Sequence, residues 1–163
     1  MDPEFVTRDI ARICRALNVV VCGVDWGHGW GPNNTLVRLL GHSRVYQFQY
    51  LPKLKQKMKW DPLGVRYHLQ RNFIMSELFF DMKNGFIEFP RWRQFEPFSK
   101  EILSIYAEYV EYRREIKYDH RPSDPDDFFH SLNFCKLAAD VYFKKDRRYT
   151  RDIDQTNEEG AHA

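Results

Sequence analysis

Two acidic segments, far apart in the chain, carry the residue types that a divalent-metal site needs. Asp25 follows the apolar run Val19–Val24 and precedes a glycine turn, whereas Asp126 and Asp127 stand where a helical pattern begins near the other end. Mg²⁺ and Mn²⁺ prefer oxygen ligands, and two such ions about 4 Å apart can hold the attacking and the leaving oxygens of a phosphodiester. If folding brings the two segments together, they predict metal-dependent hydrolysis of a phosphodiester.

The candidate catalytic residues are Asp25, Asp126 and Asp127. Asp25 is expected at the carboxyl end of a strand, where open α/β sheets contact their ligands; the alternative is a turn carboxylate that bonds its own backbone. Asp126 and Asp127 would project about 100° apart on a helix, so only one of them faces a given ion. We expect Asp25 and Asp127 to be the metal ligands and Asp126 to cap the helix or support the site, although both acids also suit a plain helix start.

His130 follows Asp127 by three residues. This spacing places it on the same helix face, where it could orient a carboxylate or contact a phosphate. The alternative is a polar residue of the first helical turn with no role in the site.

A row of lysines at alternate positions occupies the segment between Pro52 and Pro62: Lys53, Lys55, Lys57 and Lys59. In an extended segment, a period of two would put all four on one side, where they could follow a phosphate backbone. The alternative is a solvated edge strand whose lysines prevent aggregation. Arg91 and Arg93 are further candidates for DNA contact.

The composition indicates one folded domain. The 163 residues are 43% hydrophobic and 16% aromatic, and 25 Lys and Arg stand against 23 Asp and Glu, so any affinity for DNA must come from local patches. No apolar run approaches the roughly 18 residues of a membrane span, so we expect no membrane association. The three cysteines predict buried free thiols, without a disulfide framework or a zinc site.

Residues 1–5 are interpreted as a cloning scar, 6–146 as the domain and 147–163 as a polar tail. The patterns predict an α/β fold. Its first half is expected to contain a helix over 6–18 with Val6, Ile10, Ile13 and Leu17 on its buried face, a fully buried strand over 19–24, a helix over 35–40 capped by Asn33 or Asn34, and a strand over 44–50. Its second half is expected to contain a helix over 69–83, a strand over 86–90, a helix over 98–112, and a last helix from Asp126 or Asp127.

The order of these motifs resembles the nuclease domain of the large terminase subunit of tailed bacteriophages. The resemblance rests on Gly23–Gly27, Arg44–Tyr50, Tyr67–Arg71, Gly85–Pro90 and Pro125–His130. It implies an RNase H-like mixed sheet flanked by helices, metal-dependent endonuclease activity with Mg²⁺ or Mn²⁺ (two ions), and double-stranded DNA as substrate. It also implies action in the cytoplasm of the host cell, with the portal and the small terminase subunit as partners in the packaging motor.

Such domains carry three acidic positions, the third of them at the start of the last helix. Asp25 matches either the first or the second position, so this chain supplies two of the three. In the second register the first strands are absent, so the chain would be a C-terminal part of the domain and its open sheet edge would favour a homodimer. Two other functions stay open: a DNA-binding or packaging module without catalysis, and an ATP-binding actin-like or sugar-kinase-like domain. An ATP-binding domain would need phosphate-binding loops, and this sequence contains no recognisable one.

Overall fold

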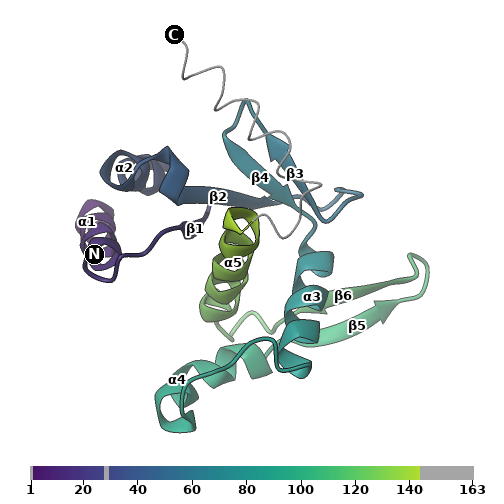
Figure 1. Ribbon diagram of the computed structural model, residues 1–163. Coiled ribbons are helices and arrows are strands. Elements are labelled where there is room, and N and C mark those ends of the chain that lie inside the picture. Colours follow the sequence, from purple (N-terminus) through teal and green to yellow (C-terminus); the bar gives the residue numbers. More distant parts are fainter. Residues whose placement is uncertain (1, 28–29, 144–163) are drawn as a thin grey trace.

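The computed structural model describes residues 2–27 and 30–143, which form a mixed α/β structure (Figure 1). Its elements in chain order are α1 (Pro3–Ala16), β1 (Cys22–Asp25), α2 (Trp30–Leu40), the short 3₁₀ helix η1 (His42–Arg44), β2 (Val45–Tyr50), β3 (Met58–Asp61), β4 (Arg66–Leu69), α3 (Arg71–Lys83), α4 (Trp92–Leu103), β5 (Tyr106–Val110), β6 (Glu115–Asp119) and α5 (Asp127–Tyr142). The predicted fold class, a mixed sheet flanked by helices, is confirmed, and the architecture is compatible with an RNase H-like fold. The expected polar tail, 147–163, lies outside the described residues.

In the part of the chain that the structure describes, the main sheet has four strands in the order β1-β2-β4-β3. β1, β2 and β4 run parallel, and β3 is antiparallel to β4 at one edge. Parallel strands end at the same side of a sheet, so the carboxyl ends of β1, β2 and β4 form one row. In the described residues β1 pairs with β2 alone, so it is an edge strand and only half-buried, not buried on both faces as its apolar sequence predicted.

The two faces of the sheet are covered by different helices. The alternation along β2 turns Phe48 towards α5, where its ring stacks on Phe134 at 5.6 Å, and turns Val45 into a cluster with α1 and α2. Gly23 lets α5 lie close to β1, because a Cβ at this position would overlap the carbonyl group of Phe134. Close packing of α5 on β1 therefore depends on a residue without a side chain.

A third cluster joins α5 to the elements beyond the sheet. Met75 and Leu78 of α3 pack against Phe129 of α5, with Ile102 of α4 and Tyr118 of β6 at its margin. Figure 1 shows α5 crossing the middle of the molecule, α4 below it and the β5–β6 hairpin extending to the right. This cluster fixes the start of α5 relative to both α4 and the hairpin.

The helix predicted over 98–112 is wrong in its second half. α4 ends at Leu103, and β5 and β6 form a hairpin whose turn contains Arg114 with φ of 52°. The aromatic and β-branched residues of β5 also fit an extended strand, so helical spacing did not decide between the two. The strand predicted over 86–90 does not form, and the β3–β4 hairpin was not predicted.

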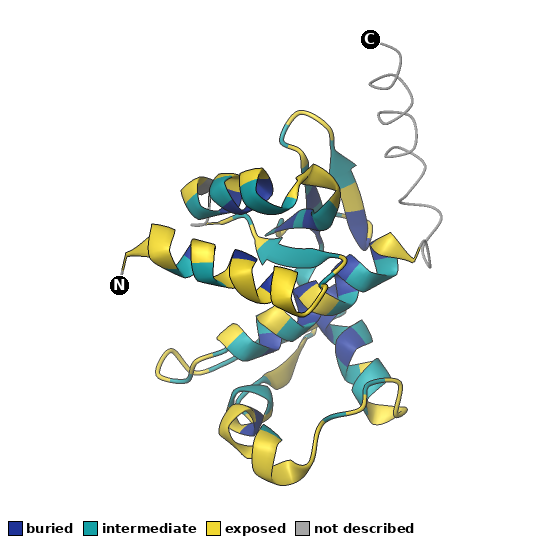
Figure 2. Ribbon diagram, turned by 60° about the vertical axis from the view of Figure 1, so that its left-hand side comes forward, coloured by how far each residue is buried: buried dark blue, intermediate teal, exposed yellow. Residues whose placement is uncertain are grey.

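The face predicted to be buried on the first helix is the wrong one. α1 begins at Pro3, with Asp2 as its cap, and packs on α2 through Thr7, Ala11 and Cys14. Ile10, Ile13 and Leu17 of the predicted stripe are exposed and Val6 is half-buried. Figure 2 shows that much of α1, next to the N label, is exposed. Small residues allow a close helix–helix approach, which explains why they form the contact. Cys135, predicted to be buried, is exposed, and Cys22 is half-buried.

Asn33, predicted to cap the second helix, lies inside α2 and is buried. Among the described helices, none combines the length and the apolar character needed to cross a membrane.

Candidate active site

The candidate site lies where the three parallel strands end. Asp25 is the last residue of β1, Tyr50 is the last of β2, and Arg71 begins α3 just after β4. Because the strand order is β1-β2-β4, these three residues stand in that order along one side of the sheet. The carboxyl side of a parallel sheet is the usual place for ligand contacts in α/β folds.

The start of α5 faces the first two strand ends across a cavity of about 640 Å³. The cavity is lined by Gly23, Val24, Asp25, Tyr50, Asp126, Asp127, His130, Ser131 and Phe134. All three candidate carboxylates and the candidate histidine thus line one cavity, although about a hundred residues of sequence separate Asp25 from the others.

The backbone at Asp25 is held from two sides. The Asn33 side chain donates a hydrogen bond to the Asp25 carbonyl at 2.7 Å, and the Trp26 amide donates to the Phe48 carbonyl at 2.7 Å, which continues the β1–β2 pairing by one residue. A Cβ on Gly27 would come within 2.8 Å of an Asp25 carboxylate oxygen. Glycine is therefore needed here for the carboxylate to keep its position.

The start of α5 is capped from another helix. The Glu101 carboxylate of α4 accepts a hydrogen bond from the Phe128 amide at 2.6 Å. Asp126 occupies the N-cap position, but its side chain makes no hydrogen bond to the helix backbone. The capping role expected for the Asp126 side chain is therefore wrong, because Glu101 takes it and leaves Asp126 to other partners.

The Asp126 carboxylate contacts three basic side chains. One of its carboxylate oxygens lies 2.9 Å from Nε2 of His130, 3.2 Å from Nε2 of His120 and 3.9 Å from the Arg71 guanidinium. Nδ1 of His120 in turn faces the carbonyls of Arg121 and Asp124. The Asp126 charge is thus offset by the protein itself, which makes it a supporting group.

A second hydrogen bond extends this network to the sheet. Nδ1 of His130 lies 2.9 Å from the Tyr50 hydroxyl. Burial lowers the pKa of His130, and the nearby Asp126 carboxylate offsets this only in part. Burial also raises the pKa of Tyr50. A neutral His130 that donates from Nε2 to Asp126 and accepts at Nδ1 from Tyr50 satisfies all three groups.

Asp25 and Asp127 have different surroundings from Asp126. In the described part of the chain, neither carboxylate has a hydrogen bond or an ion pair, and both are exposed to the cavity. Free carboxylate oxygens suit Mg²⁺, which is commonly held by one or two carboxylates together with waters and substrate phosphates. Within residues 2–27 and 30–143, however, no group of three or more His, Cys, Asp or Glu is arranged to hold a metal ion. The donor type fits, and a full set of protein ligands is not present in these residues.

The predicted one-sided row of lysines does not form. Lys53 and Lys55 lie in the turns that follow β2, and Lys59 alone belongs to a strand. Lys57 is buried and pairs with Glu77 of α3 at 2.6 Å. The chain turns between Leu51 and Lys57, so the alternation of the sequence has no extended backbone to express it. Arg91 and Arg93, at the start of α4, are exposed and do not line the cavity.

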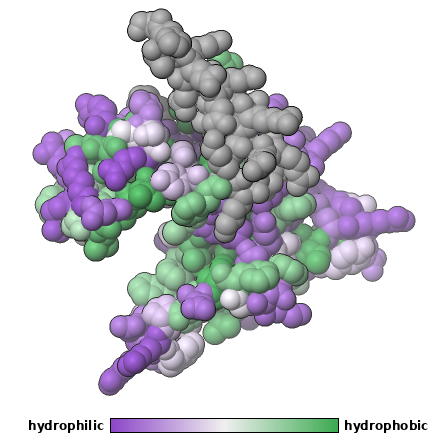
Figure 3. All heavy atoms as spheres, in the orientation of Figure 1, coloured by the Kyte–Doolittle hydropathy of each residue, from purple (hydrophilic) through white to green (hydrophobic). Residues whose placement is uncertain are grey.

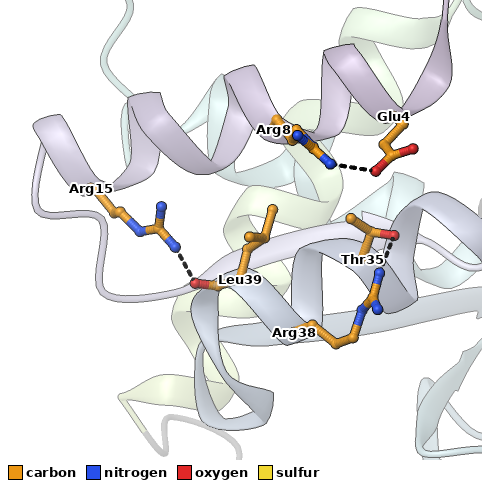
Figure 4. A pocket seen from close by; sticks show the side chains of 6 residues that line it. All are labelled: Glu4, Arg8, Arg15, Thr35, Arg38 and Leu39. Carbon is orange, nitrogen blue, oxygen red and sulfur yellow. Dashed lines mark hydrogen bonds and ion pairs between the residues drawn. The ribbon is translucent and has the colours of Figure 1, made fainter.

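A separate hollow lies between α1 and α2 (Figure 4). Its three arginines each have a protein partner: Arg8 pairs with Glu4, Arg15 donates to the Leu39 carbonyl, and Arg38 donates to Thr35. Of these contacts, the hydrogen bond from Arg15 to the Leu39 carbonyl joins the two helices, and the other two lie within one helix each. The hollow holds one carboxylate, which is engaged by Arg8, so it offers no comparable place for a metal.

Sequence reasoning missed Tyr50 and Glu101 as members of the site. Tyr50 could have been found from its place at the end of a strand parallel to that of Asp25. Glu101 carries no local signal, because its role depends on how α4 packs on α5.

No protein-family model matches this chain, and no curated protein and no solved structure matches it.

Proposed function

We propose that this chain is part of a metal-dependent DNA endonuclease, the nuclease domain of a viral DNA-packaging terminase that cuts concatemeric DNA. The observation that carries the proposal is the shared cavity. Asp25 and Asp127, whose carboxylates have no hydrogen bond or ion pair among the described residues, line it together with Asp126, which is paired with His130. The ordered resemblance of the motifs to terminase nuclease domains supports the same activity. The portal, the small terminase subunit and the host cytoplasm are part of this proposal.

The residues around the cavity have different roles in the proposed activity. Asp25 and Asp127 would hold Mg²⁺ or Mn²⁺ at the mouth of the cavity, where such ions supply Lewis-acid stabilisation of the charge that develops on the phosphate. His130 and Arg71 hold the Asp126 carboxylate at the start of α5, and Tyr50 holds His130 through its hydroxyl. The helix start itself favours a negative phosphate beside it.

The remaining ligands would come from water, from phosphate oxygens or from a further acid. The outer edge of β1 has no strand partner among the described residues. A strand added at this edge would run next to Asp25, so another polypeptide segment could bring a third carboxylate to the cavity. The homodimer expected from the sequence is one way to fill that edge.

Plasmid nicking tests the proposal. The chain is incubated with supercoiled DNA and Mn²⁺, beside an EDTA control and the variants Asp25→Asn and Asp127→Asn. We expect nicking that EDTA and either substitution abolish, while Arg8→Gln, on the far hollow, leaves it unchanged. Nicking that persists in both aspartate variants would contradict the proposal.

The second candidate function is a DNA-binding module without catalysis. It is favoured by the small number of acidic ligands in the described residues. A folded chain that binds DNA and neither binds Mn²⁺ nor nicks a plasmid would support this function over the first.

A further inference from the structure

A second cavity, of about 470 Å³, adjoins the candidate active site along the same side of the sheet. One wall comes from the strand ends, with Tyr50, Gln70 and Arg71, and the other from the β5–β6 hairpin, with Arg113 and Lys117. We call this cavity the hairpin groove. Tyr50 lines both the hairpin groove and the active-site cavity, so the two spaces are neighbours.

Arg71 links the groove to the site. One of its guanidinium nitrogens donates to the Tyr118 carbonyl of the hairpin at 2.7 Å, and another lies 3.9 Å from Asp126. The same side chain therefore touches the hairpin, lines the groove and reaches the active-site network. A ligand that enters the cavity beside Asp126 would meet Arg71 next.

The groove carries a local excess of positive charge. Arg71, Arg113 and Lys117 line it, against the single carboxylate of Glu115. Arg113 and Lys117 form ion pairs with Glu115 and Asp119, but their side chains are 61% and 48% exposed. Exposed pairs of this kind are weak, so a phosphate can compete for either cation. Figure 3 shows hydrophilic side chains gathered at the end of the hairpin, at the right of the view.

The turn of the hairpin adds an aromatic surface. Tyr112 is 81% exposed, and the Arg113 guanidinium lies 5.1 Å from the centre of its ring. This contact holds the Arg113 side chain over the turn without burying it.

We infer that the hairpin groove binds the phosphate backbone of the DNA duplex whose scissile phosphate enters the active-site cavity, through Arg71, Arg113 and Lys117. The inference rests on the proposed function for the choice of ligand. An acidic protein segment would satisfy the same charges. However, Tyr50 lines both cavities and Arg71 of the groove lies 3.9 Å from Asp126, so the groove adjoins the proposed phosphodiester-cleaving site, which favours DNA. Since the net charge of the chain is only +2, such a patch is needed for any affinity.

Fluorescence anisotropy with a labelled DNA duplex in EDTA tests the inference, because binding is then measured without metal and without cleavage. The groove variant is Arg113→Gln/Lys117→Gln. The matched control is Arg8→Gln/Arg12→Gln, which removes two exposed, ion-paired arginines from α1. We expect the groove variant to bind about tenfold more weakly than the control. The slope of log K against log salt should also fall in magnitude by about 1.8 for two lost phosphate contacts.

Equal affinity of the two variants would overturn the inference, as would a wild-type chain that does not bind the duplex. A groove variant that loses polyglutamate binding while keeping DNA binding would assign the groove to an acidic protein instead. If the double variant fails to fold, the single variant Arg113→Gln, on the exposed turn, takes its place in the assay. We expect it to bind the DNA duplex more weakly than the control. Absence of plasmid nicking, with groove-dependent binding intact, would reject the proposed nuclease and leave this inference standing.

Discussion

The three aspartates of the active-site cavity have different surroundings, and these surroundings predict different effects of substitution. Asp126 lies within 3.2 Å of two histidines, whereas Asp25 and Asp127 have no partner among the described residues. Asp126→Asn removes a charge that these bases face, so we expect it to lower the free energy of unfolding by about 1–3 kcal/mol. Asp25→Asn and Asp127→Asn should change it by less than about 0.5 kcal/mol. Urea unfolding of the three variants measures this, and an equal loss in all three would contradict the assignment.

The buried His130 predicts a dependence of stability on pH. Its pKa in the folded chain is lowered from 6.5, chiefly by burial. The unfolded chain therefore takes up the proton first as the pH falls. The contribution of His130 is complete above about pH 6.5 and is lost as the pH drops towards the folded pKa. Between about pH 7.5 and about pH 5.5, urea unfolding should show a larger loss of stability for the wild type than for His130→Gln. Parallel losses in the two proteins would contradict the neutral His130.

The packing of the helices on the sheet makes its own prediction. α1 contacts α2 through Ala11, which is fully buried, whereas Leu17 is 72% exposed. Ala11→Leu should lower the free energy of unfolding by about 1–3 kcal/mol, because the extra atoms have no room. Leu17→Ser should change it by less than about 0.5 kcal/mol. Urea unfolding compares them; a greater loss for Leu17→Ser would mean that α1 packs through its apolar stripe.

The elements also show what the sequence could and could not predict. The end of β1 and the start of α5 were predictable, because an apolar run before Asp25 and acids after Pro125 are local signals. The prediction that four lysines share one exposed side is wrong, because Lys57 is buried and pairs with Glu77, twenty residues further along the chain. The β5–β6 hairpin was missed because Tyr109 and Tyr112 fit a helical spacing by coincidence. The place of Tyr50 at a strand end was predictable, but its position between Asp25 and Arg71 follows only from the strand order.

A network of ion pairs joins α5 to α3 and to the segment that precedes β3. Lys136 of α5 lies 3.2 Å from Asp81 and 3.7 Å from Glu77, both on α3, and 2.7 Å from Asp140 on its own helix. Glu77 also pairs with Lys57, which precedes β3. Burial opposes the charged form of Lys136, but the hydrogen bond and charge of Asp140, with Glu77 and Asp81, outweigh burial and raise its pKa above 10.5.

Removal of this cation should therefore affect the whole fold. Lys136→Met leaves the carboxylates of two helices facing one another, and we expect a loss of about 2–4 kcal/mol in the free energy of unfolding. Because the folded pKa is raised, the contribution of Lys136 is complete below about pH 10.5 and is lost as the pH rises through the folded pKa. Urea unfolding at neutral and alkaline pH measures both effects. A variant as stable as the wild type at neutral pH would show that the network contributes nothing.

The central claim is that Asp25 and Asp127 together bind a divalent metal in the active-site cavity. Electron paramagnetic resonance of free Mn²⁺, titrated with the chain, measures this binding directly. We expect saturable binding that Asp25→Asn and Asp127→Asn each weaken strongly, and that the surface variant Arg8→Gln leaves unchanged. Mn²⁺ binding that is equal in the wild type and in both aspartate variants would contradict the claim, and so would a folded wild-type chain that leaves the Mn²⁺ signal unaltered.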